Sequence, residues 1–191
     1  MTPPRNHDTA FHDGVRKTIR FLEAQNIDYF LLGGLAVGAL GEAPFTYDLD
    51  LDIFLPKEKS GLFLKAAQRA FFRVKTQEAL SSIGQFGTCR IFYGDLQIDL
   101  ILASTDLETS ALKRRKRHAL FGIKAWFPSP EDLILLKLIP GRAKDLIDAE
   151  SVILRHKGKL DASYLEKWAK RIADEAEDFR VLHQLRRLLK S

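Results

Sequence analysis

Three aspartates, Asp48, Asp50 and Asp52, stand at alternate positions in the segment DLDLDIFL. In a strand the side chains alternate between two faces, so the three carboxylates would share one face and the apolar side chains the other. Neighbouring negative charges repel, and aspartate is a poor strand former, so the arrangement lowers the stability of the strand. A divalent cation would offset the repulsion. The spacing therefore predicts a strand that binds metal.

Two further features could complete a site for phosphate chemistry. Gly33 and Gly34 follow an apolar strand predicted at 28–32 and open a short apolar helix. Glycines let the backbone approach a ligand closely, and the free N–H groups at a helix start favour an anion such as phosphate. Asp99 lies on another predicted strand, whose alternation points it to one side. Carboxylates converging from two strands suit Mg²⁺ or Mn²⁺, and two such ions can clamp the oxygens of a nucleotidyl transfer.

The elements that must position these residues follow from the periodicity of the apolar side chains. Helical spacing predicts helices at 9–25, 35–40, 57–71, 131–139, 143–155 and 162–190, the last with a candidate break near Asp178. Ser129 and Pro130 are typical of a helix start. Alternation predicts strands at 28–32, 87–93, 96–102 and 119–126 besides the aspartate strand, with Gly94-Asp95 as a hairpin turn.

This order of elements predicts a mixed α/β (α+β) fold, with a mixed β-sheet flanked by helices and followed by an all-helical region. The change of period near Phe127 marks the boundary. Residues 1–127 would form the core with its N-terminal helix, and residues 128–191 would form a C-terminal helical region that walls the site.

The composition is mildly basic, with a formal net charge of +5 over 191 residues. That charge is compatible with a polyanionic partner without requiring one. Basic residues gather at 113–118 and 180–190, and a solvated loop and a solvated helix face are the simpler interpretation of these runs. The single cysteine, Cys89, fits a reducing compartment and, in an apolar strand, a place in the core rather than a role as nucleophile. Without a secretory signal or a long apolar run, the chain is expected to be soluble and cytoplasmic.

The order and spacing of the motifs carry a resemblance to a known family. Gly33-Gly34, a short helix, a Gly-Glu loop, Thr46 and then Asp48-Leu49-Asp50 resemble the signature of DNA polymerase β-like nucleotidyltransferases. The segment 97–100 resembles the third carboxylate strand of that superfamily. The segments 129–133 and 141–148 resemble the helical region of small bacterial members, among them the AbiEii-type toxin nucleotidyltransferases. The match spans about residues 28–154.

The resemblance implies a metal-dependent enzyme that moves a nucleoside monophosphate from an NTP to a hydroxyl and releases pyrophosphate. It assigns catalysis and metal binding to Asp48, Asp50 and Asp99, and nucleotide binding to Gly33, Gly34, Thr46, Lys137 and Lys144. For the lysines, a structural ion pair with Asp145 is the competing interpretation. The acceptor could be tRNA, a protein hydroxyl or a small molecule such as an aminoglycoside. A toxin role would add a cognate antitoxin protein as a partner.

Two positions depart from the family pattern. Pro44 stands where many relatives carry an arginine, which would remove a cation that neutralises phosphate or orients the loop. Asp52 is an extra carboxylate, for which a lysine partner or an outer-shell metal contact are the two interpretations. The competing hypothesis is a nucleotidyltransferase fold that has lost catalysis and serves as a binding or antitoxin-like module. The glycines fit neither a Rossmann fingerprint nor a P-loop.

Overall fold

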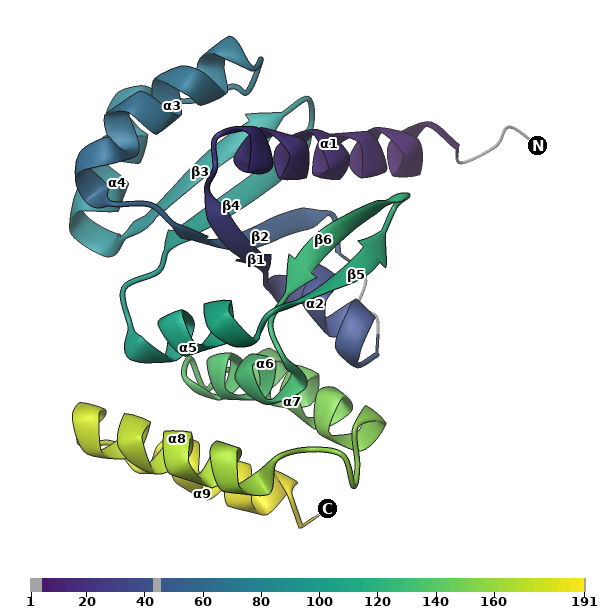
Figure 1. Ribbon diagram of the computed structural model, residues 1–191, viewed down its shortest axis with the longest axis vertical. Coiled ribbons are helices and arrows are strands. Elements are labelled where there is room, and N and C mark those ends of the chain that lie inside the picture. The colour runs from purple at the N-terminus through teal and green to yellow at the C-terminus, as the bar shows by residue number, and fades with distance from the viewer. Residues whose placement is uncertain (1–4, 43–45, 191) are drawn as a thin grey trace.

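The computed structural model describes residues 5–42 and 46–190, and Figure 1 shows a central sheet with helices around it. The strands of that sheet are β1 (Asp28–Leu31), β2 (Asp48–Phe54), β4 (Leu96–Leu102) and β3 (Thr88–Tyr93), in that spatial order. Strands β2 and β4 are parallel, and the two outer pairs are antiparallel. The mixed sheet that the sequence predicts is confirmed.

The two faces of the sheet differ in polarity, as the alternation in β2 predicts. Leu49, Leu51 and Ile53 are fully buried on one face. The hydrophobic core also takes in one side of α1 (Arg5–Ala24), which crosses the sheet in Figure 1. The polar face carries the aspartates of β2 and Asp99 of β4. This division puts every predicted carboxylate on the same side of the sheet.

Four helices connect or follow the strands of the sheet. They are α2 (Gly33–Leu40) after β1, α3 (Ser60–Arg69) after β2 and a 3₁₀ turn at Lys57–Lys59, α4 (Thr76–Phe86) before β3, and α5 (Asp106–Arg114) after β4. The C-terminal region holds α6 (Pro130–Leu138), α7 (Ala143–Arg155), α8 (Ala162–Ala176) and α9 (Arg180–Leu188). In Figure 1, α6 and α7 lie next to the sheet, and α8 and α9 form the layer beyond them. No helix in the described part of the chain is long and apolar enough to span a bilayer.

Local chemistry explains how the C-terminal helices begin and end. Ser129 caps α6 by accepting a hydrogen bond from the backbone N–H of Asp132 at 3.2 Å. Helices α8 and α9 are separate because Glu177 adopts a left-handed conformation with φ of 50°. The predicted break near Asp178 is therefore confirmed.

One predicted element is wrong, and two helices were missed. The strand predicted at 119–126 is a hairpin, β5 (Lys116–Leu120) and β6 (Ile123–Phe127), because Phe121 and Gly122 both adopt positive φ values and reverse the chain. The helices α4 and α5 were not predicted. In α5 only Leu107 and Ala111 are buried, so its apolar pattern is weak, and a capping box between Thr105 and Glu108 fixes its start.

The basic run at 113–118 is not a loop, because it spans the end of α5 and the start of β5. Four of its residues are exposed, as the simpler interpretation predicts, but its arginines have protein partners. Arg114 donates hydrogen bonds to the carboxylates of Asp132 at 3.1 Å and Glu131 at 2.9 Å, and its guanidinium lies 3.9 Å from the ring centroid of Tyr164. Arg115 and Arg117 pair with Asp28 and Glu23, and both stack on Trp126. These arginines join α5 and the hairpin to the rest of the molecule.

Replacing Arg114 should destabilise the fold far more than replacing Arg117. Asp132 is fully buried, so Arg114→Ala leaves a buried carboxylate without its cation and should lower the free energy of unfolding by about 3 kcal/mol. The pair between Arg117 and Glu23 is exposed, and Arg117→Ala should cost less than about 1 kcal/mol. Urea unfolding measures both. Equal losses would contradict the role given to Arg114.

Candidate active site

A cavity of about 530 Å³ opens between the polar face of the sheet and the helices α6 and α7. Thr105 and Glu108 line it at the start of α5, and apolar side chains of α6 close its far side. It gathers most of the residues that the sequence and the resemblance single out: Gly33, Gly34, Thr46, Asp48, Asp50, Asp52, Lys137, Lys144 and Asp145. These residues come from both predicted regions of the chain. The helical region therefore walls the site.

Gly33 is required by a close contact with Asp50. A Cβ added to Gly33 would lie 1.8 Å from Oδ2 of Asp50, and the φ of Gly33 is +58°, a value that side chains disfavour. The backbone N–H of Leu32 donates to the carbonyl of Asp50 at 2.9 Å, which ties the start of α2 to β2. A Cβ added to Gly34 would likewise lie 2.5 Å from Cγ2 of Thr46. The glycine pair thus brings the N-terminus of α2 against the aspartate strand.

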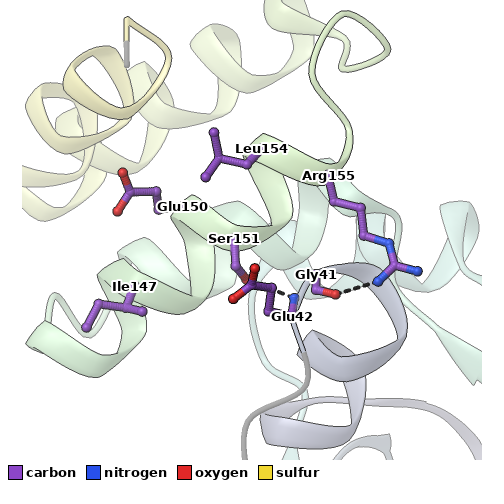
Figure 2. Close-up of a pocket in the computed structure, with 7 residues that line it drawn as sticks. All are labelled: Gly41, Glu42, Ile147, Glu150, Ser151, Leu154 and Arg155. Carbon is purple, nitrogen blue, oxygen red and sulfur yellow. Dashed lines mark hydrogen bonds between the residues drawn. The ribbon is translucent and has the colours of Figure 1, made fainter.

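The other end of α2 is anchored to α7, as Figure 2 shows. Arg155 donates to the carbonyl of Gly41 at 2.6 Å, and the hydroxyl of Ser151 accepts from the N–H of Glu42 at 3.4 Å. A hydrogen bond between the His156 ring and the carbonyl of Leu40 adds to this joint. Cationic groups suit a helix C-terminus because its last carbonyls lack partners and carry partial negative charge. The hydrogen bonds beside the pocket of Figure 2 therefore fix the C-terminal end of α2 to α7, and with it the helix that the glycine pair begins.

The strand register forms a row of charges across the sheet. Asp50 lies opposite Asp99 in the parallel pair of β2 and β4, and Asp99 lies opposite Arg90 in the antiparallel pair of β4 and β3. Burial, followed by the charges of Asp99 and Asp48, raises the pKa of Asp50, while the charges of Lys137 and Lys144 oppose this shift. The two strands therefore bring Asp50 and Asp99 together, as the sequence analysis requires.

Asp99 differs from the other two predicted carboxylates because its oxygens have protein partners. Arg90 donates from Nε to Oδ1 at 2.6 Å and from Nη2 to Oδ2 at 3.1 Å, and Gln97 donates to Oδ2 at 2.9 Å. Asp99 lines a neighbouring cavity of about 600 Å³, beside Lys75, Glu78 and Arg90. Neither Arg90 nor this second cavity was predicted from the sequence. The signal was present, because the predicted two-residue turn at Gly94-Asp95 already sets Arg90 opposite Asp99 in the hairpin.

The cations of the helical region fall into two groups. Lys137 lines the cavity and donates to Asp148 at 2.7 Å and to Asp145 at 3.2 Å, so it forms the ion pair that the structural interpretation predicts. Burial would raise the pKa of Asp145, but hydrogen bonds from Arg142 and Lys137 lower it overall. Lys144 is exposed and has no ion pair with any described residue. It is the predicted lysine that remains available to an anionic ligand.

Asp52 is fully buried, and neither carboxylate oxygen has a hydrogen-bond partner among the residues that the structure describes. The lysine partner suggested for it is therefore wrong. Burial, and then the nearby charge of Glu108, raises the pKa of Asp52 to about 8. This carboxylate lies under the same cavity as Asp48 and Asp50.

The carboxylates of the cavity suit a divalent cation that is also bound by a substrate. Within residues 5–42 and 46–190, no group of three or more His, Cys, Asp and Glu side chains is placed to hold a metal ion by itself. Mg²⁺, however, is usually bound by one or two carboxylates together with substrate phosphates rather than by an all-protein cage. The side chains of Asp48 and Asp50 form no hydrogen bond or ion pair with other described residues, and they line the cavity. These two carboxylates fit that mode.

Cys89 and Pro44 are the two remaining positions that the sequence analysis singles out. Burial, and then the charge of Asp99, raises the pKa of the Cys89 thiol to about 12, and the side chain is buried, so Cys89 is a core residue as predicted. Pro44, the departure from the family arginine, lies outside the described residues.

Comparison with solved structures identifies the fold. The antibiotic-resistance factor ANT(2'')-Ia matches with a TM-score of 0.61 and 14% identity, over 89% of this chain and 97% of that chain. An antigenic nucleotidyltransferase-like protein from Paracoccidioides brasiliensis matches with a TM-score of 0.53 and 20% identity, over 95% and 93% of the two chains. The lincosamide antibiotic adenylyltransferase LnuA, bound to lincomycin, matches with a TM-score of 0.50 and 12% identity, over 72% and 93%.

The chain therefore has the nucleotidyltransferase fold, as the resemblance implies. No protein-family model matches the sequence, and no curated protein matches it at the sequence level.

Gly33→Ala should disturb the site more than the fold, and Gly94→Ala is its matched control. Both glycines have φ of +58°, so both substitutions incur the left-handed penalty of about 1–2 kcal/mol. Only the new Cβ at Gly33 collides with Asp50, whereas nothing lies within 4 Å of a Cβ at Gly94. Urea unfolding should show a loss of stability in both variants. Mn²⁺ titration should show weakened metal binding for Gly33→Ala alone. Equal metal binding in both variants would show that the contact with Asp50 is not needed.

Asp52→Asn should stabilise the protein, and the gain should grow with pH. The pKa of Asp52 is about 8 in the folded state and near 4 when unfolded, so between these values folding takes up a proton. The free energy of unfolding of the natural protein therefore falls as pH rises through this window, and Asn removes that loss. Thermal melts should show little gain near pH 5 and roughly 1–3 kcal/mol near pH 8. Asp95→Asn, at an exposed turn, should give no such pH dependence.

Proposed function

We propose that the protein is a metal-dependent nucleotidyltransferase that moves a nucleoside monophosphate from an NTP to a hydroxyl group. In this reaction the acceptor oxygen forms a bond to the α-phosphorus, the bond from that phosphorus to the oxygen bridging it to the β-phosphate breaks, and pyrophosphate leaves. The observation that carries the proposal is the contact of Gly33 with Asp50. It sets a helix N-terminus in one cavity with two carboxylates that have no side-chain partner among the described residues.

Each part of the cavity has a role in that reaction. The free N–H groups at the start of α2 favour the phosphates, and Lys144 can approach them from the opposite wall. Asp48 and Asp50 would hold the divalent cation, and Asp99 would join them when its carboxylate is released. When bound, Mg²⁺ or Mn²⁺ would neutralise the phosphates and lower the pKa of the acceptor hydroxyl. Lys137 holds α6 and α7 together through Asp145 and Asp148, and so fixes the cationic wall.

The acceptor is better proposed as a small molecule or a protein hydroxyl than as tRNA. Binding to nucleic acid depends on basic side chains that are free to contact phosphates. In the first basic run Arg114, Arg115 and Arg117 are engaged in ion pairs, and in the second Arg186 pairs with Glu166. A cytoplasmic location and a role in a toxin–antitoxin pair remain expectations from the sequence.

The second candidate function is a binding module that has lost catalysis. The observation that favours it is that Arg90 and Gln97 bind the carboxylate of Asp99. Of the three carboxylates that the resemblance assigns to catalysis, only Asp48 and Asp50 then have side chains without a partner among the described residues. The two candidates differ in turnover, so an assay of nucleotide transfer separates them.

Asp50→Asn should abolish both metal binding and transfer. Mn²⁺ at about 100 times its dissociation constant should raise the melting temperature of the natural protein by about 5 °C, because a ligand of the folded state stabilises it. The variant should lose that gain. It should also lose pyrophosphate release when each labelled NTP is incubated with cell extract. Asp95→Asn is the control and should keep both properties.

The outcomes separate the two candidates. A metal response that depends on Asp50, without transfer from any NTP, would favour the binding module. An unchanged metal response in Asp50→Asn would show that the ion binds elsewhere and would contradict the proposed site.

A further inference from the structure

Arg90 binds both carboxylate oxygens of Asp99 and leaves few of their lone pairs free. The guanidinium donates from two nitrogens, one to each oxygen, at 2.6 Å and 3.1 Å, and Gln97 adds a third hydrogen bond at 2.9 Å. Two-pronged pairs of this kind are among the stronger hydrogen bonds in proteins. Arg90 thus acts as the counter-charge of Asp99 in the absence of another cation.

The position of Arg90 extends this role to the neighbouring carboxylates. The hydrogen bond to Asp99 raises the pKa of Arg90, and the charges of Asp48 and Asp50 contribute to the same shift. The remaining charged side chains of this cavity, Lys75 and Glu78, pair with each other at 3.1 Å. Arg90 is therefore the cation of β3 that offsets the repulsion between Asp99 and Asp50, and Lys137 and Lys144 act on Asp50 from the opposite side.

Arg90 can leave Asp99 without unfolding the sheet. It stands on β3, the edge strand, and its side chain is 54% exposed. The adjoining cavity of about 600 Å³ is lined by Ser82 and Thr88, whose hydroxyls could accept from a released guanidinium. Loss of the pair exposes no buried charge, because Asp99 itself is 28% exposed.

We propose that Arg90 and a divalent cation exclude each other at Asp99, so that metal binding to this carboxylate releases Arg90 into the adjoining cavity. This inference rests on the proposed function, because it takes the metal site at Asp48 and Asp50 as given. Arg90 and Gln97 together place one hydrogen bond on Oδ1 and two on Oδ2 of Asp99, so few lone pairs are left for a metal. A divalent cation on a remaining lone pair would lie close to the guanidinium, and the two positive charges would repel each other. Arg90 is then a positioning residue that keeps the third carboxylate in reserve until the metal arrives.

Mn²⁺ binding in the absence of nucleotide, followed by electron paramagnetic resonance, tests the exclusion. Arg90→Gln removes the competing hydrogen bonds and should tighten Mn²⁺ binding about tenfold, the equivalent of one charged hydrogen bond. Arg90→Lys keeps the positive charge but loses the two-pronged geometry, so its affinity should lie between the two. Lys75→Gln removes a charge from the same cavity without touching Asp99 and should bind Mn²⁺ as the natural protein does. In Arg90→Gln, a further Asp99→Asn substitution should cancel the gain.

A spectroscopic measurement on the natural protein reports the release directly. The Nε–H resonance of Arg90 should shift toward that of a solvated arginine when Mg²⁺ is added, and it should not shift in Asp50→Asn. Unchanged or weaker Mn²⁺ binding in Arg90→Gln, with binding that still depends on Asp50, would overturn this inference and leave the proposed function standing. Mn²⁺ binding that does not depend on Asp50 would instead overturn the proposed metal site.

Discussion

The repulsion between carboxylates on the polar face of the sheet is the constraint on which the site depends. Parallel pairing of β2 with β4 sets Asp50 opposite Asp99, and burial with these neighbouring charges raises the pKa of Asp50. Such a face is stable only if positive charge lies near it. The structure supplies that charge from two sides, through Arg90 on β3 and through Lys137 and Lys144 in the helical region.

The second constraint is the fixed position of α2 between two parts of the molecule. At its start, the absence of a side chain at Gly33 allows the Asp50 carboxylate to approach. At its end, Arg155 and His156 of the α7 end bind its last carbonyls. Because α7 also holds Lys137 through Asp145 and Asp148, one helix pair fixes both α2 and the lysine wall opposite it. The cavity is therefore built jointly by the core and the helical region.

The charge arrangement also bears on whether the fold is active. A carboxylate held by a two-pronged arginine suits a binding module as well as it suits an enzyme waiting for its metal. Asp52 supports the view that the face serves a function, since a buried carboxylate without a hydrogen-bond partner among the described residues lowers stability. An assay of nucleotide transfer distinguishes these interpretations, because both can bind a metal but only the enzyme turns over.

The sequence by itself determined the elements with strong local signals. Alternation fixed the face of Asp48 and Asp50, the glycine pair marked the start of α2, and Ser129 with Pro130 marked the start of α6. The tertiary structure alone decided which charges are free. Arg90 meets Asp99 through the register of a hairpin, and Arg114 meets Asp132 from another helix. The predicted Gly94-Asp95 turn already implies the first opposition, because a two-residue loop sets Arg90 opposite Asp99. The second pair joins residues of different helices, and no local pattern relates them. The same physical reason separates Lys137, which is bound, from Lys144, which is exposed.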